Sequence, residues 1–169
     1  SINMDWQLNH GEKTPMKPIL TFMLTALLTT PLMAASEGLK FKRHDEPNGM
    51  DDYTGQITVS GEYNYSFDDE AMGPMVCFTA DKASAKLIPR KKGDERGPWF
   101  CFRNQATALK TFKIPKKPAK GYCEYRGKAT VTVNQYSVYR EASEGSDMAQ
   151  LLGTQNIKPL SPKKCYVGY

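Results

Sequence analysis

Histidine is scarce in this chain, which contains only two, and the short motifs of several enzyme classes are missing. No G-x-S-x-G, H-E-x-x-H or phosphate-binding loop is present, so the sequence does not indicate a serine hydrolase, a zinc protease or a nucleotide hydrolase. His44 lies in a polar segment, and no pattern pairs it with a nucleophile. We therefore expect a protein that is not an enzyme and uses no cofactor or metal. A small hydrolase whose carboxylate pair is brought together only by the fold is the alternative.

Long apolar runs are also rare. Residues 16–35 combine one lysine, one apolar run and a proline ahead of Ala34 and Ala35, a pattern typical of a signal peptide that is cleaved after one of these alanines. Threonine and proline dilute the run, which falls short of the roughly 20 strongly apolar residues of a membrane anchor. We expect a periplasmic or secreted protein with no membrane insertion after cleavage.

The chain divides into four segments on this interpretation. Residues 1–15 do not begin with Met, and Gly11 and Glu12 can be encoded by a purine-rich ribosome-binding site upstream of Met16. We interpret them as a leader or an artificially added segment. Residues 16–35 are the expected signal peptide, residues 36–52 a mobile N-terminal arm, and residues 53–169 a single β-barrel-like domain.

Cysteine is limited to four residues, all of which follow the expected cleavage site: Cys77, Cys101, Cys123 and Cys165. An even number in an exported domain predicts two disulfides. Zinc binding is disfavoured because no C-x-x-C pair and no cysteine close to a histidine is present. Four cysteines allow three pairings, of which we favour Cys101 with Cys123 and Cys77 with Cys165.

Alternating hydrophobicity predicts most of the regular structure. Ile57, Val59, Tyr63 and Tyr65 share one face of a strand, and Gly61 on that face predicts a bulge or bend. Further strands are expected at residues 75–80, 86–88, 99–103, 122–125 and 128–139, with a turn at Gly127, a bulge near residues 134–135, and a strand or short helix at 147–152. Residues 104–112 are expected to form a short helix.

About five strands with one helix between the third and the fourth predict a mainly β fold, a small Greek-key barrel of the OB type with two disulfides. Residues 55–61, residues 99–102 before the helix, and residues 127–133 resemble the secreted small OB-fold proteins related to anticodon-binding-like domains. The resemblance covers residues 53–152. It implies a barrel whose sheet face or loops bind a polymer or another protein, and it does not imply catalysis.

Charge is divided unevenly along the chain. Residues 36–81 contain three basic and ten acidic residues, a net charge of −7, whereas residues 82–169 contain eighteen basic and six acidic residues, a net charge of +12. The second part predicts a basic surface for a protein or an acidic envelope polymer, unless the two parts neutralise each other in the fold. An inhibitor or immunity-type protein would fit these features. The predicted binding residues are Arg90, Lys91, Lys92, Arg96, Lys116, Lys117 and Arg126.

Aromatic residues beside these cations suggest a second interpretation. Trp99, Phe100 and Phe102, together with Tyr122 and Tyr125, would form a stacking surface for single-stranded nucleic acid or an oligosaccharide. An exported protein seldom meets nucleic acid, which makes a nucleic-acid partner the weaker choice. The interpretation also requires that these rings are exposed and do not point into the core.

Overall fold

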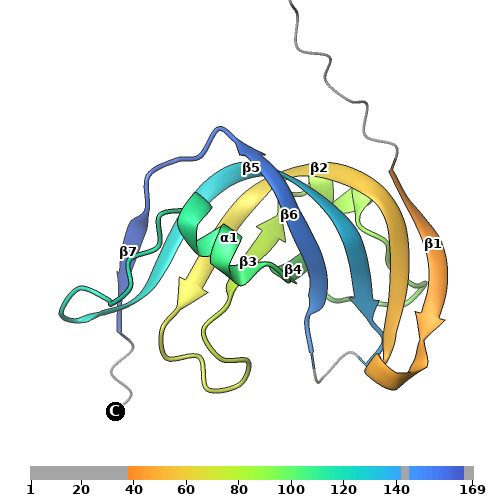
Figure 1. Ribbon diagram of the computed structural model, residues 1–169, viewed down its shortest axis with the longest axis horizontal. Helices are drawn as coiled ribbons and strands as arrows, with labels where there is room; N and C mark the ends of the chain where they lie inside the picture. The colour runs from red at the N-terminus through yellow and green to blue at the C-terminus, as the bar shows by residue number, and fades with distance from the viewer. Residues whose placement is uncertain (1–37, 142–144, 166–169) are drawn as a thin grey trace, which may run out of the picture. The chain divides into compact units, whose positions relative to one another are not determined.

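Figure 1 shows the computed structural model of the chain, which describes residues 38–141 and 145–165. Within these residues, seven strands form one sheet in the order β1-β2-β3-β4-β6-β5-β7. The strands are β1 (Gly38–Asp45), β2 (Met50–Ser66), β3 (Val76–Ala80), β4 (Trp99–Phe102), β5 (Tyr122–Tyr139), β6 (Asp147–Gln155) and β7 (Ser161–Lys164). Because β2 also pairs with β5, the five strands from β2 to β6 close into a ring.

The order of strands in the ring is that of an OB-type barrel. Neighbouring strands are antiparallel except for β4 and β6, which run parallel. Helix α1 (Gln105–Thr111) connects β4 to β5, the third and fourth strands of the ring. This arrangement confirms the predicted mainly β, Greek-key barrel with one short helix.

Two strands lie outside the ring, β1 beside β2 and β7 beside β5. The prediction of a mobile arm over residues 36–52 was wrong for residues 38–52, which form β1, the 3₁₀ helix η1 (Glu46–Asn48) and the start of β2. Most of β1 is exposed, and of its apolar residues only Leu39 packs partly against the core. Backbone pairing with β2, from Gly38 opposite Gln56 to Asp45 opposite Met50, holds it in place.

Two other local predictions were wrong. Residues 86–88 do not form a strand, because 3₁₀ helix η2 (Ser84–Leu87) occupies this position and Asp81 accepts a hydrogen bond from the Ser84 backbone at its start. Gly127 is not a turn, since β5 continues through it. The predicted bulge near residues 134–135 is confirmed: the pairing of β5 with β6 shifts between Asn134 and Ser137.

The barrel interior is filled by the residues that alternate along β2 and β5. Ile57, Val59, Tyr63 and Tyr65 all point inward, which confirms the predicted apolar face of β2. On β5, the inward series changes from odd-numbered to even-numbered residues across the bulge, as the sequence pattern requires. Aromatic rings from β3 and β4, together with Phe112 directly after α1, complete the core.

Glycine is required where the barrel interior is most crowded. At Gly61 the register of β2 is continuous, so the predicted bulge is absent, and an added Cβ would overlap the Thr79 backbone of β3. At Gly127 an added Cβ would overlap the phenol of Tyr63, a fully buried ring that stacks on Phe112. Both glycines allow a close approach that a side chain would prevent.

Gly127→Ala is therefore expected to lower the free energy of unfolding by about 1–3 kcal/mol, the usual cost of overpacking a core. Gly153→Ala is the matched control, since nothing lies within 4 Å of a Cβ added to this glycine of β6. It is expected to change stability by less than about 0.5 kcal/mol. Urea unfolding of both variants tests the prediction, and equal stabilities would contradict it.

The two predicted disulfides are present, but the favoured pairing was wrong. Cys77 is bonded to Cys101, and Cys123 is bonded to Cys165. The sheet register gives the reason, because Cys77 and Cys101 lie directly opposite each other on β3 and β4. Cys165 follows β7, where its backbone N–H bonds to the Gly121 carbonyl and brings the sulfur beside Cys123. The disulfides indicate an oxidising compartment.

Candidate functional site

Arg90 and Arg96, two of the predicted binding residues, hold the loop of residues 89–98 against the barrel. Arg90 donates from Nη1 to Asp147 Oδ2 at 2.5 Å, and Nη1 of Arg96 lies 3.8 Å from Asp147 Oδ1. Arg96 also donates to the Tyr139 carbonyl at 2.7 Å. The two arginine side chains are only 17% and 15% exposed. Their guanidinium groups therefore form ion pairs within the protein and are largely closed to an outside partner.

Asp147 is the centre of this buried network. Its side chain is 1% exposed and also accepts hydrogen bonds from the Tyr136 hydroxyl and the Tyr139 backbone N–H, both at 3.0 Å. Burial, together with the negative charge of Asp147, raises the pKa of Tyr136 well above its usual value. Tyr136 therefore acts as a hydrogen-bond donor in the core, and Asp147 accepts its proton in that hydrogen bond.

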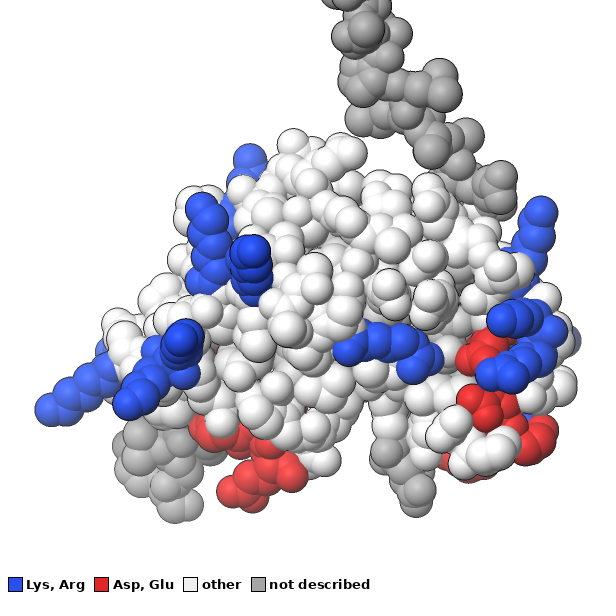
Figure 2. All heavy atoms as spheres, in the orientation of Figure 1, with Lys and Arg blue, Asp and Glu red and all other residues white. Residues whose placement is uncertain are grey.

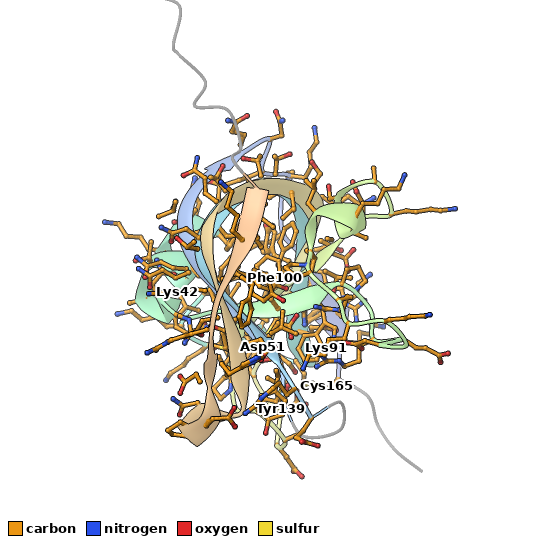
Figure 3. The ribbon with its side chains drawn as sticks, turned by 90° about the vertical axis from the view of Figure 1, so that its right-hand side faces the viewer. Lys42, Asp51, Lys91, Phe100, Tyr139 and Cys165 are labelled. Atoms are coloured by element: carbon orange, nitrogen blue, oxygen red, sulfur yellow. A yellow bond between two sulfur atoms is a disulfide. The ribbon has the colours of Figure 1, made fainter. Side chains whose placement is uncertain are left out.

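Lys91 binds a second buried carboxylate at the same end of the barrel. Asp51, whose side chain is 3% exposed, lies 3.0 Å from Lys91 Nζ, and both residues are labelled in Figure 3. Asp51 Oδ1 also lies 2.7 Å from His44 Nδ1. Burial alone would raise the pKa of Asp51, but the hydrogen bonds from His44 and Lys91 hold it below its ordinary value. The neighbouring Lys92 is exposed on the loop.

Asp94 pairs with Arg96 within this loop and makes the stability of the folded protein depend on pH. It accepts from Arg96 Nε at 2.9 Å and Nη2 at 2.7 Å. These side-chain hydrogen bonds lower its pKa from 3.8 to about 2. Because the pKa is lower in the folded protein, the stabilising effect is complete above about pH 4 and is lost as the pH falls toward 2.

Asp94→Asn is accordingly expected to reduce stability at neutral pH and to weaken the loss of stability between about pH 4 and pH 2. Asp68→Asn, at an exposed position on the loop after β2, is the control and should retain the wild-type pH profile. Urea unfolding measured at several pH values tests this. An unchanged slope in Asp94→Asn below pH 4 would refute the assignment.

Lys116 and Lys117 belong to a larger group of exposed lysines around the N-terminal end of β5, which we call the basic strip. It consists of Lys113, Lys116, Lys117, Lys120, Lys128, Lys158, Lys163 and Lys164, all of them exposed. Figure 2 shows basic side chains gathered on the side of the molecule where β5 and β7 lie. The strip therefore combines the loop after α1 with two segments from the C-terminal part of the chain.

Backbone pairing brings the lysines of the C-terminal part to this place. Lys163 lies opposite Glu124 and Lys164 opposite Tyr122 in the pairing of β7 with β5. The Lys158 backbone N–H donates to the Lys128 carbonyl at 2.8 Å. The sequence prediction omitted Lys158, Lys163 and Lys164, although the absence of any acidic residue after Asp147 was a usable signal.

The lysines of the strip have no carboxylate partner among the described residues. None of their ammonium nitrogens lies within 4.0 Å of a carboxylate oxygen there. Arg126 differs, because its guanidinium lies 2.7 Å from Glu124 and 3.6 Å from Glu62. Lys91 is also remote from the strip, since its partner Asp51 pairs with the opposite end of β5. The structure thus groups Lys116 and Lys117, but separates them from Arg90, Lys91, Lys92 and Arg96.

The predicted aromatic stacking surface is mainly internal. Phe100 and Phe102 are 0% exposed and pack with each other and with Phe78, and Figure 3 shows Phe100 inside the barrel. Tyr125 is also buried, whereas Trp99 and Tyr122 are half-buried. Alternation along β4 sends these rings into the core. The interpretation as a stacking platform for single strands therefore loses Phe100, Phe102 and Tyr125, three of its five rings.

Among the described residues, no three histidine, cysteine, aspartate or glutamate residues are grouped so that they could hold a metal ion. No helix in the described part of the chain has the length and hydrophobicity needed to cross a bilayer. Comparison with protein families, curated proteins and solved structures finds no match to this chain.

Proposed function

We propose that this protein is an exported, non-catalytic binding module that recognises an acidic polymer of the cell envelope through the basic strip. The observation that carries the proposal is the grouping of exposed lysines without carboxylate partners on adjoining segments of β5, β7 and the loop after α1. Elsewhere, at Arg90, Arg96 and Lys91, the cations are paired with buried carboxylates. The strip therefore offers positive charge to a partner from outside.

The chemistry of the strip favours a polymer over a folded protein. Protein interfaces are enriched in aromatic residues and arginine and contain little lysine, because their energetic centres are dry and well packed. Flexible lysines act as point charges, which suits a polyanion that releases counterions when it binds. The exposed large apolar residues Phe41, Leu87, Leu152 and Ile157 come from four different segments. An inhibitor or immunity-type role would require an apolar anchor as well.

The proposal of a non-catalytic role is supported by the state of the most buried carboxylates. Asp51 and Asp147 are both engaged by cationic side chains and closed to solvent, with side chains 3% and 1% exposed. A glycoside hydrolase needs two carboxylates that reach the substrate, one of them in its protonated form. The pKa of Asp51 is lowered, which is opposite to the shift of a general acid.

Export is proposed from two observations that agree. The segment of residues 16–35 has the pattern of a cleaved signal peptide. The two disulfides are those of a protein that folds in an oxidising compartment. A periplasmic or secreted protein would meet acidic glycans and phosphate-rich polymers at the cell envelope.

Neutralising part of the strip tests the function. The fourfold variant Lys116→Gln, Lys117→Gln, Lys163→Gln and Lys164→Gln is expected to bind heparin, used as an acidic polymer, at least about tenfold more weakly at about 0.15 M salt. Isothermal titration calorimetry measures the affinity. The reason is the loss of four point charges from one continuous surface.

A variant with the same change in net charge is the control. It carries Lys40→Gln, Lys82→Gln, Lys86→Gln and Lys92→Gln, at exposed positions outside the strip. Its affinity for heparin is expected to fall less than about threefold, through long-range attraction alone. An equal loss in both variants would mean that only net charge matters, which would contradict the proposal. Tighter binding to a folded protein partner than to any acidic polymer would also contradict it.

A further inference from the structure

A polar cavity of about 390 Å³ lies where β2 and β5 separate. The two strands pair up to Asp52 opposite Ser137 and again from Gln56 opposite Asn134, so that three residues of β2 face two of β5. Throughout this interval β2 stays paired with β1 on its other side, with Tyr53 opposite Phe41. The cavity is thus built into the barrel wall, and β1 forms one of its sides.

The backbone on both sides of the cavity adopts conformations that fix its shape. Gln135 of β5 has φ 46°, which is strained for a residue with a side chain, and Gly55 of β2 has φ 95°. A Cβ at Gly55 would overlap the Gly38 carbonyl of β1. Strained backbone of this kind persists only where the surrounding structure holds it, and it is concentrated at binding sites.

Asp52, one of the two carboxylates of the lining, is already satisfied by protein groups. Asp52 accepts from Arg43 Nε at 2.9 Å and from the Ser137 hydroxyl at 2.6 Å. Burial would raise the pKa of Asp52, but the hydrogen bonds from Ser137 and Arg43 hold it below its ordinary value. Asp52 is therefore ionised and forms an ion pair with Arg43, and its charge also attracts Arg103 without an ion-pair contact.

Two cations of the lining remain without a carboxylate partner among the described residues. Arg103 donates from Nη2 to Ser137 Oγ, its one side-chain hydrogen bond in the described part of the protein, although a guanidinium has five N–H donors. Lys42 of β1 lines the same cavity and is labelled in Figure 3. With Lys42, Arg43 and Arg103 against Asp45 and Asp52, the lining carries one net positive charge.

The lining also includes Asn134, whose side-chain oxygen has no hydrogen-bond partner in the described part of the chain. This oxygen, Oδ1, is buried. A buried acceptor of this kind costs free energy unless a ligand or water donates to it. A ligand with a hydroxyl or N–H donor for the side chain of Asn134 and an anionic group for Lys42 and Arg103 would match this lining.

We propose that this cavity binds a small hydroxylated carboxylate, of the size and chemistry of a sugar acid. The volume fits a ligand of this class, since small-molecule pockets begin at about 300 Å³. The net positive charge of the lining favours a carboxylate over a zwitterionic amino acid. The site is independent of the basic strip, because β1 and β7 lie on opposite sides of the barrel (Figure 1).

Titration of ¹⁵N-labelled protein with D-glucuronate, glucose and inorganic phosphate tests the proposal. Glucuronate is expected to shift the amide signals of residues 54–55 and 134–137 in a saturable way, and glucose and phosphate are expected to have at least about tenfold lower affinity, because each lacks one of the two recognised features. Lys42→Gln and Arg103→Gln should each weaken glucuronate binding by about tenfold.

Lys92→Gln is the matched control and should retain wild-type affinity, because Lys92 does not line the cavity. Lys42 is exposed on an outer strand, so its variant keeps the test valid if Arg103→Gln proves unstable. Equal binding of phosphate and glucuronate would show an adventitious ion only and would overturn the proposal. Equal binding of glucose, or no shifts at these residues, would overturn it as well.

Discussion

Asp147→Asn is expected to lower the free energy of unfolding by about 3–5 kcal/mol, the usual cost of removing one partner from a buried ion pair. The substitution keeps the shape of the side chain but removes its charge, and it leaves Arg90 and Arg96 with too little negative charge in a nearly closed site. The hydrogen bond from Tyr136 is also weakened. Urea unfolding at neutral pH measures the effect.

Two further variants separate the ion pair from the general effect of losing an aspartate. Asp68→Asn, on the exposed loop after β2, should change stability by less than about 0.5 kcal/mol. The double variant Arg90→Met and Asp147→Leu should recover much of the loss, because no charge is then buried without a partner. A loss below about 1 kcal/mol in Asp147→Asn would contradict the buried network.

Replacing both Cys77 and Cys101 by alanine is expected to lower the free energy of unfolding by about 3 kcal/mol. The two residues are separated by 24 positions, so their bond restricts the unfolded chain considerably. In the folded state they lie opposite each other on β3 and β4, within the ring of the barrel. The loss should therefore appear in one cooperative transition, measured by urea unfolding without reductant.

The variant in which Cys123 and Cys165 are replaced provides the comparison. This bond spans 42 residues but attaches β7, a strand of four exposed residues at the edge of the sheet. Its loss should first remove hydrogen-exchange protection from residues 161–164, while the ring strands keep theirs. If loss of the Cys77–Cys101 bond affected only local exchange and left global stability unchanged, the assigned role of that disulfide would be wrong.

Much of the fold could be predicted because a strand with one buried face has alternating apolar and polar residues in its sequence. The alternation from Ile57 to Tyr65 identified β2, and the phase change near Asn134 identified the bulge of β5. The order of strands and the short helix then limited the choice to an OB-type barrel. Where a strand has no buried face, as in β1, the pattern is missing and the strand was not predicted.

Contacts between residues far apart in the sequence could not be predicted, because they depend on which strands become neighbours in the fold. The disulfide partners depend on which strands are neighbours, and the sequence left three pairings open until the register placed Cys77 opposite Cys101. Arg90 and Asp147 are 57 residues apart, and nothing local indicates that the loop of Arg90 folds back over the barrel. A charged loop was therefore predicted as a binding surface.

The basic strip could be predicted only in part. Lys116 and Lys117 were predicted as binding residues because they form a local basic run. Lys163 and Lys164 join them only because β7 pairs with β5. The binding role of all of these lysines stays a prediction, as does the resemblance to the secreted small OB-fold proteins.

The salt dependence of polyanion binding tests the account most directly. The logarithm of the heparin affinity of the wild-type protein should fall linearly with the logarithm of salt concentration between about 50 and 300 mM. With Lys116, Lys117, Lys163 and Lys164 changed to glutamine, the slope should become shallower by about three, at about 0.7–0.9 for each lysine removed. The same slope in both proteins, or no heparin binding by the wild type at low salt, would contradict the proposed role of the basic strip.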